Sequence, residues 1–245
     1  MSLHAVLERC PHVLLDFDGP MCATFSAVSS AAATLELGEL LSREGIDIPA
    51  YLLEAADPFA LLYYVAANAP EHSSMAEQAL TKLEIAGVST AQPTPGLRDL
   101  LTSLANTDHT VTVVSNNSAA AVQAFLDAEN LNGSIRGVVA RANSDPSRLK
   151  PDPHLLLLAA SELGAPPGDC LLLGDSVTDV EAAHHAGTGS IAFANKPEKR
   201  DRFLTVHPDA IVSSLLDVAD ALTGSSSRLT DRNSRGRNTS SQTLG

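Results

Sequence analysis

Val13-Leu14-Leu15-Asp16-Phe17-Asp18-Gly19 is the stretch of sequence on which the fold depends. An apolar run with acids at its far end is typical of a buried strand that opens into a site, because ligands of open α/β sheets bind at the carboxyl ends of the strands. Two carboxylates placed two residues apart require positive charge between them, and Mg²⁺ prefers hard oxygen ligands. Asp-Gly is also a common hairpin signal, so this stretch alone leaves a turn open as the alternative.

A second apolar run, Val111-Thr112-Val113-Val114, ends in the small polar residues Ser115-Asn116-Asn117-Ser118. A hydroxyl or amide at a strand end can bond a phosphoryl oxygen, and the N–H groups of a following helix add partial positive charge. Ser118 equally fits a simple N-cap for the alanine-rich segment that follows. The run therefore indicates a strand and a helix start, with phosphate binding as one of two interpretations.

The third segment is Arg148-Leu149-Lys150-Pro151-Asp152-Pro153, which precedes four consecutive leucines. Asp152 as N-cap and Pro153 in the first turn predict a helix start. Lys150 then lies just outside a helix N-terminus. The alternative for any single lysine of this kind is a solvated side chain in a loop.

The fourth segment, Cys170-Leu171-Leu172-Leu173-Gly174-Asp175-Ser176-Val177-Thr178-Asp179, is an apolar run that leads into two acids. If a helix begins near Val177, Asp175 projects from the strand end and Asp179 lies in the first helical turn. Acids in this arrangement can hold a metal ion directly and through an outer shell. Gly-Asp is common in turns, so this segment too has a plain alternative.

Taken in this order, the four segments resemble the signature of the haloacid dehalogenase-like superfamily: Asp-x-Asp after a strand, Ser or Thr after a second, Lys before a helix, and Gly-Asp-x-x-x-Asp after a third. The resemblance extends from about Val13 to Val212, and Ala182-Ala183 and Ala186-Gly187 are placed as in the phosphoglycolate-phosphatase-like branch. It implies an α/β fold, with a Rossmann-like parallel sheet core, helices on both faces, and an inserted all-helical cap subdomain.

The spacing of the motifs also predicts an insertion. Between Asp18 and Ser115 lie 96 residues, far more than one crossover helix needs. Helical spacing and alanine and leucine content characterise three stretches there, 24–43, 58–69 and 71–87. The resemblance identifies this insertion as a helical cap placed after the first motif, with hinges near residues 21–23 and 91–95.

After Gly96, strand-like runs alternate with helical segments, which indicates a parallel sheet covered on both faces. These runs are residues 111–115, 137–140, 169–174, 189–194 and 210–213. We therefore predict an α/β core from residues 1–20 and 93–223, with the helical cap at 21–92.

Residues 224–245 differ in composition from the rest of the chain. They are almost all Ser, Thr, Asn, Gly and Arg, with four arginines and a single acid, Asp231. Such a segment buries too little apolar area to offset the entropy of ordering. We expect a disordered basic tail.

Composition limits the partners and the location. The formal net charge is −13 and tryptophan is absent, which argues against a nucleic-acid backbone as a partner. No stretch approaches the roughly 20 apolar residues that span a bilayer, and Glu8 and Asp16 interrupt any signal-peptide core. The three cysteines have no metal-site spacing. We expect a cytoplasmic monomer or homodimer without a nucleic-acid or membrane partner.

The resemblance implies a role for each matching residue. Asp16 would be the nucleophile that forms an aspartyl-phosphate, and Asp18 the general acid and base. Mg²⁺ would be bound by the side chains of Asp16 and Asp175 and by the backbone carbonyl of Asp18.

The other motif residues would bind phosphate or orient their neighbours. Ser115, the Asn116 amide and Lys150 would hold the remaining phosphoryl oxygens. Asp179 would orient Lys150 or a water molecule of the Mg²⁺ shell. Pro20 departs from the family pattern, where Thr or Val is usual after Asp-x-Asp-Gly, and it would stiffen the turn toward the cap.

These assignments predict a Mg²⁺-dependent phosphatase that acts on a small phosphorylated metabolite. Asp18 separates this reaction from carbon–halogen and carbon–phosphorus cleavage, whose enzymes lack an acid there. A phosphosugar mutase of the same superfamily and a non-catalytic binding module remain as alternatives. We expect substrate discrimination to come from the cap, where the polar side chains with sufficient reach are Arg43, Tyr63, Tyr64, His72 and Lys82.

Overall fold

The computed structural model describes residues 2–25, 29–142 and 144–224. Within them, six parallel strands form one sheet in the order β3-β2-β1-β4-β5-β6. The strands are β1 (His12–Leu15), β2 (Thr110–Ser118), β3 (Gly137–Arg141), β4 (Cys170–Gly174), β5 (Gly189–Phe193) and β6 (Ala210–Val212). The predicted α/β fold with a parallel sheet is confirmed.

The first strand lies inside this sheet, which excludes the hairpin interpretation of Asp18-Gly19. β1 pairs in parallel with both β2 and β4, and Leu15 is opposite Val113 on one side and Leu173 on the other. The chain order reverses at β1, since its neighbours run toward β3 on one side and β6 on the other. The residues that follow β1 and β4 therefore emerge together at the switch point, where open α/β sheets bind ligands.

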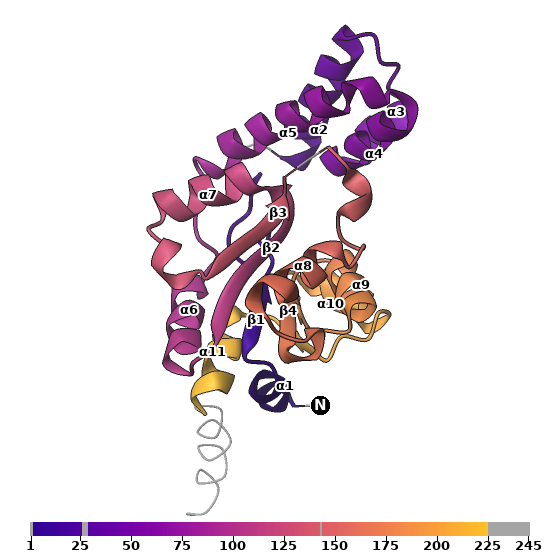
Figure 1. The fold of residues 1–245 in the computed structure, drawn as a ribbon. Coiled ribbons are helices and arrows are strands. Elements are labelled where there is room, and N and C mark those ends of the chain that lie inside the picture. The colour runs from indigo at the N-terminus through magenta and orange to yellow at the C-terminus, as the bar shows by residue number, and fades with distance from the viewer. Residues whose placement is uncertain (1, 26–28, 143, 225–245) are drawn as a thin grey trace, which may run out of the picture.

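Helices cover both faces of the sheet (Figure 1). One face carries α1 (Leu3–Arg9), α6 (Leu97–Asn106), α7 (Ala119–Ala128) and α11 (Leu215–Thr223), and the other carries α8 (His154–Leu163), α9 (Val177–Ala186) and α10 (Pro197–Leu204). Short 3₁₀ turns occur at Pro70–His72, Asn132–Ser134, Pro146–Arg148 and Pro167–Asp169. In the described residues, no helix is both long and apolar enough to cross a membrane.

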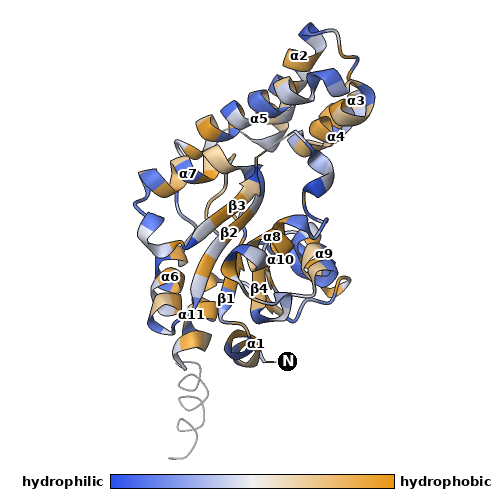
Figure 2. Ribbon diagram, in the orientation of Figure 1, coloured by the Kyte–Doolittle hydropathy of each residue, from blue (hydrophilic) through white to orange (hydrophobic). Residues whose placement is uncertain are grey.

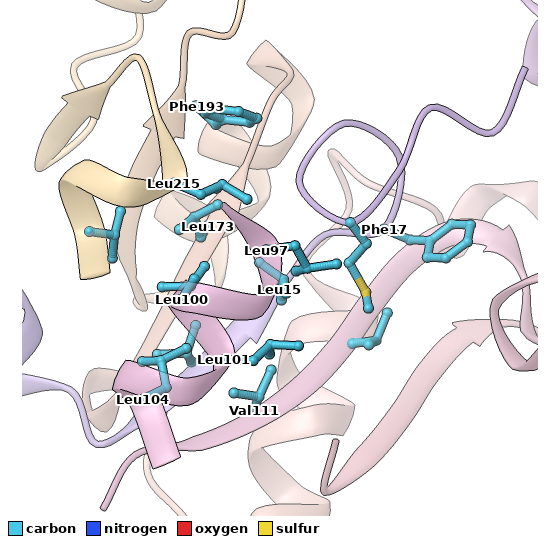
Figure 3. Packing of buried hydrophobic residues seen from close by; sticks show 14 of the residues in the cluster. Leu15, Phe17, Leu97, Leu100, Leu101, Leu104, Val111, Leu173, Phe193 and Leu215 are labelled. Carbon is cyan, nitrogen blue, oxygen red and sulfur yellow. The ribbon is translucent and has the colours of Figure 1, made fainter. Parts of the chain in front are cut away.

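Alternate residues of the strands supply the two cores. Val13 and Leu15 pack into the cluster formed with α6 and α11, whereas Leu14 packs into the cluster formed with α8 and α9. This follows from the pleat, which points successive side chains to opposite faces. Much of β2, β3 and β4 is orange in Figure 2, because both faces of the sheet are covered and apolar residues predominate in these strands. Figure 3 shows the leucines of α6 over Leu15 and Leu173.

A group of four helices lies beyond the ends toward which the strands point (Figure 1). It consists of α2 (Ser30–Arg43), α3 (Ala50–Glu54), α4 (Pro58–Asn68) and α5 (Ser73–Val88). Their buried residues, among them Leu37, Leu61 and Leu80, form an apolar cluster separate from those of the sheet. The predicted insertion of helices is confirmed as an architecture, and the boundaries at 21 and 92 stay a prediction.

Two details of this helical group differ from the sequence prediction. The first helix begins at Ser30 with Ser29 as its N-cap, rather than at residue 24, where the Thr24 amide donates to the Asp18 carboxylate. The short helix α3 was not predicted, since five residues without a capping side chain give little periodic signal. The tail predicted at 224–245 lies outside the described residues except for Gly224.

The two connections to the helical group lie side by side. Cys22 forms isolated bridges with both Asp18 and Pro93. The Thr94 amide donates to the Met21 carbonyl at 2.8 Å, and the Thr94 hydroxyl donates to the Gly19 carbonyl at 2.6 Å. Hydrogen bonds therefore fasten both connections to the turn that follows Asp18.

Gly19 in this turn approaches Asp175 very closely. Its φ is +98°, and a Cβ built on it would lie 2.2 Å from Cγ of Asp175. Only glycine combines this dihedral angle with this approach. The turn therefore packs directly on the carboxylate that follows β4.

Candidate active site

The four sequence segments converge on one cavity of about 200 Å³ at the carboxyl ends of the strands. Except for Phe59, its lining residues are polar: Asp16, Asp18, Phe59, Asn116, Asn117, Lys150, Asp175, Ser176, Thr178 and Asp179. Of the site residues predicted from sequence, all but Ser115 line this cavity. A second cavity of about 280 Å³ adjoins it and shares Asp18, Asp175 and Ser176.

Lys150 is the positive centre of the site. Its Nζ lies 2.7 Å from Asp16 Oδ1 and 2.6 Å from Asp179 Oδ1, and its side chain is 2% exposed. The Asn116 side chain fixes the backbone there, since Nδ2 donates to the Lys150 carbonyl and Oδ1 accepts from the Lys150 amide. Lys150 is therefore a buried, paired residue rather than a solvated loop lysine.

The helix that follows Lys150 begins almost as predicted. Asp152 Oδ1 accepts from the His154 amide at 2.9 Å, but the helix starts at His154, so Pro153 rather than Asp152 occupies the N-cap position. The Asp152 side chain still bonds the first turn. The difference is one residue and leaves Lys150 at the predicted place.

Burial and charge together set the protonation of this cluster. Burial, with the charge of Asp179, raises the pKa of Asp16 well above its ordinary value despite the opposing effect of Lys150. Burial alone would raise the pKa of Asp179, but Lys150 and hydrogen bonds from Ser176 outweigh it and lower that pKa. Burial disfavours the charge of Lys150, yet the carboxylates of Asp16 and Asp179 raise its pKa. Asp16 is therefore the carboxylate of this pair whose charge is not fully compensated.

Asp179 also forms hydrogen bonds that stabilise the start of α9. It forms a capping box with Ser176 at the start of α9, and its Oδ2 also accepts from the Asp175 amide. The helix begins at Val177, as predicted. This arrangement holds Asp175 and Asp179 in fixed relation at the end of β4.

Asp175 forms an ion pair with Lys199 of α10. Burial raises the pKa of Asp175 to about 6 even though Lys199 acts to lower it. Lys199 was not predicted from sequence, because it lies 24 residues after Asp175 in no recognisable motif. Only the packing of α10 beside α9 brings it to the site.

The donor set of this site fits a divalent metal ion. Ligand oxygens of Asp16, Asp175 and Asp179 all lie within 4.8 Å of one another. Three buried or half-buried carboxylates here have two ammonium partners, Lys150 and Lys199, so negative charge is in excess. Hard carboxylate oxygens are the ligands that Mg²⁺ and Ca²⁺ prefer. The Asp18 carboxylate lies outside this cluster.

Asp18 lies at the mouth of both cavities and is exposed. Its Oδ1 accepts from the Thr24 amide at 2.7 Å, which orients the carboxylate toward the connection to the helical group. A carboxyl group at this position is accessible to water and to a ligand in either cavity. At this position Asp18 can exchange a proton with water and with a bound ligand.

Ser115 lies behind the wall of the cavity. It is fully buried, its hydroxyl donates to Asn117 Oδ1 at 3.2 Å, and it accepts from the Asn117 amide at 3.0 Å. Asn117 lines the cavity instead. In this structure Ser115 supports the segment from inside, and a direct contact with phosphate stays a prediction.

Phe59 of α4 is the residue by which the helical group lines the cavity. The five side chains that the sequence suggested for discrimination line neither cavity. Tyr64 donates to the Asp47 carbonyl, and Arg43 and His72 pair with acids of their own helices or turns. The sequence prediction chose those five residues by polarity and side-chain length. Closeness to the cavity depends instead on how α4 packs against the core.

Comparison with known proteins agrees with this geometry. A family model described as haloacid dehalogenase-like hydrolase matches residues 11–187. The chain is 26% identical over 209 residues to an N-acetylmuramic acid 6-phosphate phosphatase of Pseudomonas aeruginosa, covering 85% of this chain and 86% of that protein. It is 30% identical over 128 residues to a phosphoglycolate phosphatase of Salmonella paratyphi A, covering 52% of this chain and 50% of that protein.

A solved structure has the same fold. A haloacid dehalogenase-like family protein of Streptococcus pneumoniae aligns with a TM-score of 0.64 at 16% identity, covering 86% of this chain and 97% of that one. This likeness concerns the fold alone.

Proposed function

The chain belongs to the haloacid dehalogenase-like hydrolases, in the branch of its phosphatase relatives, and we propose that it hydrolyses a small phosphorylated metabolite with Mg²⁺. The observation that carries the proposal is the paired Asp16 and Lys150 beside Asp175 and Asp179 at the switch point of the sheet. The names of the relatives favour phosphatase over mutase activity. The intact set of acids and lysine favours an enzyme over a non-catalytic binding module.

In the proposed first step, an Asp16 carboxylate oxygen attacks phosphorus. The bond between phosphorus and the ester oxygen breaks, and Asp18 gives its proton to the leaving alkoxide. The product is an aspartyl-phosphate at Asp16. Lys150 hydrogen-bonds Asp16 Oδ1 at 2.7 Å, which orients the carboxylate.

In the second step, Asp18 takes a proton from water while the water oxygen attacks phosphorus. The bond between phosphorus and Asp16 breaks, and inorganic phosphate leaves. Asp18 is exposed at the mouth of the cavity, so water and leaving group reach it from the same side. Residues 115–118 and Lys150 would hold the phosphoryl oxygens through both steps.

Mg²⁺ would be held by Asp16 and Asp175, with the Asp18 carbonyl, and Asp179 would hold its surroundings in place. When bound, it would neutralise the negative charge of the phosphoryl group and of the acids. The raised pKa values of Asp16 and Asp175 support this, because both carboxylates need additional positive charge to ionise.

The test is phosphate release from p-nitrophenyl phosphate and from a panel of metabolite phosphates, with Mg²⁺ and with a chelator. We expect turnover that requires the metal. Beryllofluoride, which imitates an acyl phosphate, should be retained in the presence of Mg²⁺ by the wild-type protein and lost in Asp16→Asn. Turnover that persists after exhaustive chelation, or in pure Asp16→Asn protein, would contradict the proposed mechanism.

A further inference from the structure

A buried ion cluster joins the helical group to the sheet. Arg141, at the end of β3, donates through Nη1 and Nη2 to the two carboxylate oxygens of Glu84 on α5, at 3.0 and 2.9 Å. The Glu84 side chain is 0% exposed and that of Arg141 is 1% exposed. Both are charged groups removed from water, so each depends on the other for compensation.

Glu84 has two further donors, and both belong to the carboxyl end of β2. Asn117 Nδ2 donates to Glu84 Oε1 at 3.1 Å, and the Ser118 amide donates to Oε2 at 2.9 Å. The carboxylate therefore accepts four hydrogen bonds, two from β3 and two from residues 117 and 118. It connects an element of the helical group with the wall of the active-site cavity.

Arg141 acts on the same segment. Its Nη1 also donates to the Asn116 carbonyl at 2.8 Å, and its Cζ lies 5.6 Å from the centroid of Phe59. Asn116 in turn bonds the backbone of Lys150 on both sides. The contacts thus extend continuously from α5 to the lysine that pairs with Asp16.

We propose that Glu84 and Arg141 are positioning residues for the phosphate-binding segment 115–118, so that the helical group completes the phosphate site rather than only covering it. This inference rests on the proposed function, because it assigns phosphate binding to that segment. Neither residue lies in any of the four sequence segments. Asn117 transmits the effect, since it bonds Glu84 with its Nδ2 and Ser115 with its Oδ1.

Glu77 provides a matched control on the same helix. It lies two turns before Glu84 on α5, and its Oε2 accepts from Arg141 Nε at 2.7 Å. It accepts hydrogen bonds from Arg141 and Thr81, and among the described residues it makes none with residues 115–118. Glu77→Gln therefore weakens only the contact between α5 and β3. Glu84→Gln also removes a carboxylate oxygen that accepts from residues 117 and 118.

The experiment measures the competitive inhibition constant of inorganic phosphate and the kinetics of p-nitrophenyl phosphate hydrolysis with Mg²⁺. We expect Glu84→Gln to weaken phosphate binding about 10-fold to 100-fold, as for lost hydrogen bonds to a charged group. KM should rise with kcat changed much less, because the phosphoryl group is held in the ground state and the transition state alike. Glu77→Gln should keep the wild-type inhibition constant.

A double variant guards against simple unfolding. Glu84→Leu with Arg141→Met replaces both buried charges with apolar groups, which often preserves stability. We expect a folded protein with a lowered melting temperature and weakened phosphate binding, because Asn117 and the Ser118 amide have lost their acceptor. Wild-type phosphate binding in this variant would overturn the proposal, as would equal losses in Glu77→Gln and Glu84→Gln.

Hydrogen exchange separates this inference from the proposed function. The Ser118 amide donates to Glu84, so its exchange should accelerate in Glu84→Gln and stay near the wild-type rate in Glu77→Gln. If the wild-type protein neither binds nor releases phosphate, the proposed function fails, and so does the assignment of this pair to phosphate binding. If the wild-type protein is active but exchange at 116–118 is unchanged in Glu84→Gln, this inference alone fails.

Discussion

Lys150 Nζ lies 2.7 Å from Asp16 Oδ1, although the two residues are 134 positions apart in the chain. The acid directly follows β1 and the lysine lies in the segment before α8, and the parallel sheet aligns both at one edge. The pair is almost entirely removed from solvent. Its effect on reactivity can be measured by removing either charge.

Asp16→Asn should abolish turnover while the protein remains folded. An amide has no carboxylate oxygen to attack phosphorus, although it retains the shape of the side chain. Lys150 would keep Asp179 as its partner. Circular dichroism and the melting temperature serve as folding controls beside the phosphate-release assay, and activity from a highly purified variant would count against Asp16 as the nucleophile.

Asp18→Asn should lower turnover by roughly 10²-fold to 10⁴-fold, the usual contribution of a general acid or base. The loss should be smaller for p-nitrophenyl phosphate than for an alkyl phosphate, because p-nitrophenolate leaves without a proton. Rates for the two substrate types are compared at saturating Mg²⁺. Equal losses for both would show that Asp18 does not supply a proton to the leaving group.

Stabilisation by Mg²⁺ should increase with pH. Burial raises the pKa of Asp175 to about 6, so the folded protein binds this proton more tightly than the unfolded chain. The stability that the protonated carboxyl contributes is present below its ordinary pKa of 3.8 and is lost as pH rises through about 6. Asp16, whose pKa is also raised, acts in the same direction.

Because Mg²⁺ competes with that proton, its effect on the melting temperature should grow from about pH 5 to about pH 7.5 and then level off. Thermal unfolding with and without Mg²⁺ at each pH measures this. In Asp175→Asn the difference in melting temperature between samples with and without Mg²⁺ should be smaller than in the wild type at every pH. A wild-type difference that shrinks as pH rises would contradict the assignment of Asp175 as a ligand.

Lys199→Met should tighten Mg²⁺ binding. The lysine pairs with Asp175 and so competes with the metal for that carboxylate. Titration calorimetry in the absence of substrate gives the dissociation constant directly. Lys196→Met is the matched control, since Lys196 lies exposed before the same helix and its loss changes the net charge equally. The same dissociation constant in both variants would show that the ion pair of Lys199 with Asp175 does not affect Mg²⁺ binding.

Phe59→Leu should change discrimination among metabolite phosphates more than basal hydrolysis. Phe59 lines the cavity from α4, so it can contact a leaving group that extends beyond the phosphoryl group. We expect ratios of kcat/KM between metabolites to shift by about 1 kcal/mol, as for a modest change in apolar contact. Tyr51→Leu, at an exposed position of α3, is the control. Parallel losses for every substrate would indicate that Phe59 only excludes water.

The fold was predictable because its signals are local. Apolar runs such as Val13-Leu14-Leu15 and Leu171-Leu172-Leu173 are long enough to be buried on both faces, and the polar residue after each run marks the carboxyl end. A helix start near Val177 places Asp175 at the strand end and Asp179 in the first helical turn, and α9 begins at Val177. These features depend on neighbouring residues.

The contributions of Lys199, Phe59, Glu84 and Arg141 depend on tertiary packing and carried no local signal. A lysine in a charged helix such as α10 is indistinguishable in sequence from a solvated one. Glu84, in a helix with other acids, has the composition of a surface residue, yet it is completely buried. Only the docking of α5 against β2 and β3 shows which acid faces Arg141.

The adjoining connections at Cys22 and Pro93 have a consequence for engineering this chain. Because the chain leaves and re-enters the core at neighbouring positions, the helical insertion could be exchanged for that of a relative through a short splice. The ion cluster sets a condition on such a chimaera. A transplanted insertion without a carboxylate at the place of Glu84 would leave the buried Arg141 guanidinium without this ion-pair partner. Arg141 and Glu84 must therefore be exchanged together.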